Sequence, residues 1–175
     1  MNSSPSILVG CNQKVVCIRV QGKGSFQNSK GIKDFAMAMI HRGHRNFVVD
    51  LADCPVMDST FMGTLTGVAL RLRELGQGDV HVINSNERNS DLLMGLGLDQ
   101  ILSLDGASSA ETGCQPDAQD ALPADPAQQA DKRATTETMI AAHQALVDAD
   151  AQNLCKFKDV IDYLKQDLHS QESLD

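Results

Sequence analysis

The sequence predicts an α/β fold, in which a mixed, largely parallel sheet of four to five strands is covered by helices and followed by a C-terminal helical pair. Two observations support this fold. Over the first 105 residues, short β-branched segments alternate with longer segments of helical spacing, an order typical of parallel strands joined by crossover helices. After residue 134, helical spacing returns in two further segments.

Four segments are short and rich in β-branched residues, and each is predicted as a strand: residues 14–20, 47–51, 80–83 and 101–104. A further short strand near residues 7–10 is placed to form a hairpin with residues 14–20. That hairpin would be antiparallel and would make the sheet mixed.

Apolar residues recur at helical spacing in three segments between these strands: residues 32–40, 61–75 and 92–96. The same spacing predicts two C-terminal helices, over residues 135–148 and 151–168, with Asp150 or Asn153 as the cap of the second. Two amphipathic helices are not stable alone in water. We therefore expect them to pack on each other and on the first domain, or on a partner.

Composition divides the chain into a first domain of residues 1–105, a flexible acidic linker of residues 106–134, and a C-terminal helical segment of residues 135–175. The linker consists mainly of Ala, Asp, Gln and Pro, with Leu122 as its only large apolar residue. Residues 106–175 hold 5 of the 15 basic and 13 of the 23 acidic residues, so they carry the whole net charge of -8.

Composition also excludes several classes of function. No segment approaches the roughly 18–20 apolar residues of a membrane span, and the N-terminal residues lack the features of a signal peptide, so we expect a cytoplasmic protein without membrane partners. The acidic charge argues against nucleic-acid binding. Five scattered cysteines without a Cys-x-x-Cys pair predict reduced thiols and no metal site.

Three polar or glycine-bearing loops follow predicted strands, at residues 21–28, 52–60 and 84–89. Loops that leave parallel strands gather at one edge of the sheet, where open α/β folds place their functional sites. The middle loop ends in Asp58, Ser59 and Thr60, directly before a predicted helix. Either Asp58 or Ser59 would cap this helix, or a hydroxyl exposed there would receive a phosphate.

The loop edge also supplies candidate partner-binding residues. Phe26, if exposed, would anchor a partner. Methionines beside the triplet either fill core gaps or form an adaptable binding surface. The full set of candidates is Gly24, Ser25, Phe26, Met57, Asp58, Thr60, Phe61, Met62 and Asn84.

We do not expect an enzyme or a bound cofactor. Residues 22–25 lack the glycine and Lys-Ser/Thr spacing of a phosphate-binding loop. A hydrolase would need a histidine near Ser59 and a Gly-x-Ser-x-Gly elbow, and the elbow is absent from the sequence. His41 and His44 flank a helix-breaking glycine without a third ligand, which favours a solvated helix end over a metal site.

The stretch FVVDLADCPVMDSTFMGTL, followed by LRELGQGDVHVINSNERNSDLLMGLGLDQIL, resembles the STAS domain family, in particular bacterial anti-sigma factor antagonists. The resemblance covers about residues 7–105. It implies that Ser59 accepts a phosphate, with Thr60 as the second candidate. It also implies two partners: an anti-sigma factor with serine kinase activity, which binds the unphosphorylated form, and a serine phosphatase. Phe61 replaces the glycine that usually follows the triplet in this family.

Two alternatives remain open at this stage. The same loop edge would suit a small-ligand or nucleotide-sensing STAS domain. The chain would instead be a constitutive scaffold if Ser59 were only a helix cap.

Overall fold

The structure is a computed structural model, and it describes residues 6–11, 15–104 and 131–173. The five-stranded sheet has the order β1-β2-β3-β4-β5. The β1–β2 pair is antiparallel, whereas the other three pairs are parallel. This confirms the predicted hairpin and the mixed, largely parallel sheet. The strands are β1 (Ser6–Cys11), β2 (Val16–Gln21), β3 (Asn46–Asp53), β4 (Asp79–Ile83) and β5 (Ser103–Leu104).

Each parallel strand pair is connected through a helix, as the alternating pattern predicts. The chain after β5 resumes in the described residues with two long helices joined by a 3-10 turn. The helical elements are α1 (Phe26–His41), α2 (Ser59–Glu74), α3 (Glu87–Gly95), η1 (Leu98–Gln100), α5 (Lys132–Ala149), η4 (Ala151–Asn153) and α6 (Leu154–Glu172).

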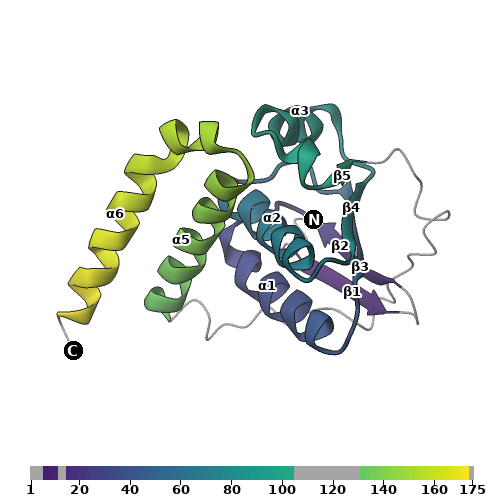
Figure 1. Ribbon diagram of the computed structural model, residues 1–175, viewed down its shortest axis with the longest axis horizontal. Coiled ribbons are helices and arrows are strands. Elements are labelled where there is room, and N and C mark those ends of the chain that lie inside the picture. Colours follow the sequence, from purple (N-terminus) through teal and green to yellow (C-terminus); the bar gives the residue numbers. More distant parts are fainter. Residues whose placement is uncertain (1–5, 12–14, 105–130, 174–175) are drawn as a thin grey trace.

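The core lies between the sheet and the helices α1 and α2. Side chains alternate along β3, so that Phe47, Val49 and Leu51 enter this core while Val48 belongs to a smaller apolar cluster with Cys17 and Ile83. Figure 1 shows α5 beside α1 and α2, and α6 beyond α5. Leu146 extends the core from the first domain into α5.

Helix α5 extends beyond its predicted range of residues 135–148 at both ends, whereas α6, predicted over residues 151–168, begins later, after η4, and also ends later. Residues 132–134, expected in the linker, belong to α5, because the Asp131 carboxylate accepts a hydrogen bond from the Ala134 N–H and caps the helix. The rest of the expected linker, residues 106–130, lies outside the described residues. Asp150 caps the short η4 turn through the Gln152 N–H, so it does not cap α6 directly.

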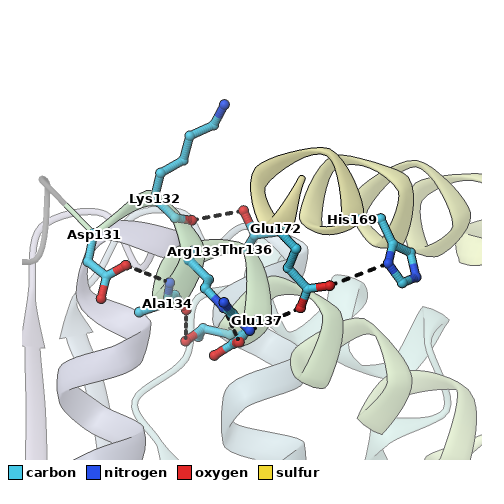
Figure 2. Close-up of polar contacts among 9 residues, drawn as sticks. Asp131, Lys132, Arg133, Ala134, Thr136, Glu137, His169 and Glu172 are labelled. Carbon is cyan, nitrogen blue, oxygen red and sulfur yellow. Dashed lines mark hydrogen bonds and ion pairs between the residues drawn. The ribbon is translucent and has the colours of Figure 1, made fainter. Parts of the chain in front are cut away.

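Polar contacts join the start of α5 to the end of α6 (Figure 2). Arg133 contacts Glu137 on its own helix at 3.2 Å and Glu172 on α6 at 3.0 Å, and His169 lies 3.5 Å from Glu172. At the other end of the pair, the buried Asn153 side chain donates to the carbonyls of Leu146 and Leu96. The helical pair is therefore attached both to itself and to the segment after α3.

Two further observations concern the sequence predictions. Among the described helices, none is long and apolar enough to cross a membrane. Cys17 is disulfide-bonded, so the expectation of reduced thiols is wrong at this residue. Cys54 and Cys155 are thiols.

Candidate switch site at the start of α2

The loops that precede α1 and α2 are joined by backbone hydrogen bonds. The Gly24 N–H donates to the Val56 carbonyl at 3.0 Å, and the Asp58 N–H donates to the Gly24 carbonyl at 2.9 Å. Gly24 and Met57 thereby form an isolated parallel β-bridge. The two loops, residues 21–28 and 52–60, therefore form one continuous surface at the edge of the sheet, called the ledge below, as the strand order predicts.

Asp58 caps α2 and also holds the start of α1. One carboxylate oxygen accepts a hydrogen bond from the Phe61 N–H at 2.8 Å, and the other accepts one from the Phe26 N–H at 2.9 Å. Ser59 is the first residue inside α2. The prediction that Ser59 caps the helix is therefore wrong, because the carboxylate of the preceding residue accepts the Phe61 N–H in its place. The constitutive scaffold stays a prediction.

The Ser59 hydroxyl is instead paired with a histidine from the C-terminal segment. Its Oγ lies 2.9 Å from Nε2 of His143 on α5, and His143 Nδ1 lies 2.6 Å from the Met139 carbonyl. A carbonyl only accepts, so Nδ1 carries a proton. In the neutral ring Nε2 is then the acceptor, and the Ser59 hydroxyl is the donor.

His143 is surrounded on its remaining sides. Only 4% of its surface is exposed, and its ring meets the Phe157 ring of α6 edge-on, with centroids 5.3 Å apart. Ser59 itself is half-buried. The pair supplies the histidine that a hydrolase would need, but its second nitrogen faces a backbone carbonyl, and the buried imidazole has almost no surface on which a substrate could bind.

The other predicted site residues separate into exposed and buried groups. Phe26 is 41% exposed, Asn84 is exposed and Asp58 is half-buried. These side chains are available to a partner. Six candidates are buried and act in this structure by shaping the ledge: Gly24, Ser25, Met57, Thr60, Phe61 and Met62.

Phe61 replaces the family's usual glycine without crowding Ser59. Its ring is fully buried, and a Cβ atom at Gly24 would lie only 2.8 Å from it. The ring thus fills the core beneath the ledge, and Gly24 provides the space for it. Thr60, the second candidate for phosphorylation, is only 5% exposed.

The third loop is bound to the middle loop and to β3 by polar side chains. The Asn84 amide donates to Asp50 at 3.0 Å, the Asn86 amide to the Pro55 carbonyl at 3.1 Å, and the buried Asn89 amide to the Cys54 carbonyl at 2.9 Å. Burial raises the pKa of the Cys54 thiol above its usual range. The three loops named from the sequence therefore do meet at one edge, with Ser59 among them.

Comparison with known proteins agrees with this architecture. The STAS domain family model matches residues 6–111. SpoIIAA, an anti-sigma factor antagonist solved in its unphosphorylated form, is 16% identical; the alignment covers 61% of this chain and 93% of that chain, with a TM-score of 0.51. Its phosphorylated form, described as a Bacillus cell fate determinant, gives 16% identity, coverage of 61% and 96%, and a TM-score of 0.52.

A third solved structure, of the putative anti-sigma factor antagonist TM1081 from Thermotoga maritima, is 18% identical. The alignment covers 61% of this chain and 92% of that chain, with a TM-score of 0.55. A comparison with curated proteins gives no match. The structural likenesses establish the fold, and the family model covers more than half of the sequence. The chain therefore belongs to the STAS domain family.

Proposed function

We propose that this protein is a non-enzymatic, cytoplasmic binding module of the anti-sigma factor antagonist type, gated by phosphorylation of Ser59. One observation carries the proposal: Asp58 performs the capping, so the Ser59 hydroxyl is at the helix start without being needed to hold the helix together. Likeness to a fold solved in phosphorylated and unphosphorylated forms supports the same assignment.

The partner on this proposal is an anti-sigma factor with serine kinase activity. It would dock at this edge of the sheet, with the exposed Phe26 ring as an apolar anchor and the exposed Asn84 side chain as a polar contact. A serine phosphatase acting on the phosphorylated form would restore binding. The kinase would take the phosphate from ATP, and this chain itself is expected to hold no cofactor.

Phosphorylation would act by placing charge in the middle of that interface. The phosphate would be close to the Asp58 carboxylate, which is fixed by two backbone N–H groups. Bringing both into contact with a partner requires removal of water from two negative groups. A change of about 4 kcal/mol in docking free energy corresponds to roughly a thousandfold change in affinity, which is enough to redirect a kinase between binding partners.

The test is to recover the protein's partners from its own host with tagged full-length chains, and to map phosphate by mass spectrometry. Wild type and Ser59→Ala should retain a kinase-type partner, whereas Ser59→Asp should lose it. Ser170→Asp is the matched control, since it makes the same chemical change on the exposed face of α6. A Ser59→Asp chain that binds the partner as tightly as wild type, or phosphate only at other residues, would refute the proposal.

A further inference from the structure

The hydrogen bond between Ser59 and His143 depends on a proton that phosphorylation removes. In the unmodified chain the hydroxyl donates to Nε2 at 2.9 Å. Once the Oγ atom is esterified it has no hydrogen to donate, and the Nε2 atom of a neutral imidazole offers only a lone pair to the oxygens of a fully deprotonated phosphate. The Nε2 atom would then be a buried acceptor without a donor, which is an unfavourable state.

The imidazole cannot relieve this state by rotating away on its own. Its Nδ1 is bound to the Met139 carbonyl at 2.6 Å, and the Phe157 ring of α6 lies against it. Three covalently attached phosphate oxygens also need more room than the 2.9 Å between Oγ and Nε2 provides. A change at Ser59 is therefore passed to the α5 backbone and, through Phe157, to α6.

From this geometry we infer that the hydrogen bond between Ser59 and His143 acts as a latch, meaning that it helps to hold α5 against α2. A phosphate on Ser59 and the present docking of α5 then exclude each other. The inference rests on the proposed function in taking Ser59 as the phosphate acceptor. It assigns to His143 the role of a positioning residue, and it makes the C-terminal helical pair an internal sensor of the phosphorylation state.

The exclusion works in both directions, because coupling between two equilibria is reciprocal. A docked α5 keeps the Ser59 hydroxyl turned toward His143, so a kinase must first break that hydrogen bond. Loss of one hydrogen bond of ordinary strength corresponds to about a threefold to tenfold change in an equilibrium constant. We expect loosening of α5 to favour phosphorylation by the same factor.

The close approach of α2 and α5 provides a way to displace α5 without touching the latch. A Cβ atom at Gly63 would lie 2.2 Å from the Ala142 carbonyl oxygen on α5, whereas one at Gly67 would lie 3.8 Å from the Ala145 Cβ. Gly63→Ala should therefore push α5 away. Gly67→Ala is the matched control, since it brings the same gain in helix propensity one turn later with only an ordinary contact.

The experiment is amide hydrogen exchange on the full-length protein carrying phosphoserine at position 59, introduced during translation so that no kinase is needed. We expect amides of α5 and α6 to exchange more than about tenfold faster than in the unmodified chain, because the phosphate costs more than the one lost hydrogen bond, with β2, β3 and β4 unchanged. Ser59→Ala, which removes the donor without adding charge, should give a smaller acceleration in the same helices. Gly63→Ala should show the exchange pattern of a displaced α5, and Gly67→Ala should match wild type.

Unchanged exchange in α5 with phosphoserine, or with Ser59→Ala, would overturn the latch. NMR signals of a protonated His143 ring, together with unchanged exchange, would show the reason: an imidazolium would then pair with the phosphate while α5 stays docked. These results are independent of whether a kinase exists. A failed partner recovery would therefore count against the proposed function alone, and a failed exchange experiment against the latch alone.

Discussion

Replacing Asp58 by Ala tests the claim that this residue, and not Ser59, organises the switch site. The substitution removes a helix cap, which costs about 0.5–2 kcal/mol. It also removes the acceptor for the Phe26 N–H at the start of α1, and a net hydrogen bond is worth about 0.5–1.5 kcal/mol. We expect the free energy of unfolding to fall by about 1–3 kcal/mol, since water reaches the half-buried carboxylate and replaces part of both bonds.

The assay is urea denaturation followed by circular dichroism. Asp58→Asn should lose about half as much stability as Asp58→Ala, because its amide oxygen still accepts from the Phe61 N–H while its NH2 group faces the Phe26 N–H. Asp53→Ala, at the exposed end of β3, is the control and should lie within about 0.5 kcal/mol of wild type. If Asp58→Ala were as stable as Asp53→Ala, the capping argument and the availability of Ser59 that follows from it would both be wrong.

Two further predictions concern the packing beneath the ledge. Gly24→Ala should destabilise the fold by about 1–3 kcal/mol, because its Cβ would collide with the Phe61 ring. Gly31→Ala is the control, since a Cβ at this position of α1 meets nothing within 4 Å. It should gain about 0.5–1 kcal/mol of stability in the same denaturation assay. Iodoacetamide at pH 8 should modify the exposed Cys155 well before Cys54, since burial raises the Cys54 pKa and keeps it a thiol; equal rates measured by peptide mass spectrometry would contradict that environment.

Much of the fold could be predicted because its elements depend on local patterns. The β-branched segments placed each strand within a few residues, and the short hairpin at the N-terminus fixed the one antiparallel pair. Helices α1 and α3 begin earlier than the apolar spacing indicates, at Phe26 and Glu87, because their first turns are mostly polar. The start of α5 was missed for a local reason as well. Asp131 lies in a stretch of Ala, Asp and Gln that has the composition of a linker, so its role as a cap was not visible from composition.

The candidate site was predictable only as far as topology determined it. Strand order brought the three loops together, but Asp58 and Ser59 are both good capping residues, and the choice between them depends on side-chain geometry. Pairing of Ser59 with His143 joins positions 84 residues apart, and no periodicity in the sequence connects them. In the same way, the Phe61 ring can lie in the core only because Gly24 has no side chain in that space, a contact between positions that are distant in the sequence.

Asp58 caps α2 and Ser59 does not, which also explains how one phosphate on Ser59 could have a large effect on docking. The partial positive charge at the start of α2 is already opposed by the Asp58 carboxylate, which two backbone N–H groups hold in place. A phosphate added at the next residue meets fewer free donors than it would at an uncapped helix, and it lies close to a like charge. In the docked position it would also lie against Nε2 of the buried His143 ring. The phosphorylated state is therefore least favourable when Ser59 is enclosed, whether by a partner on the ledge or by α5, and most favourable when Ser59 faces water.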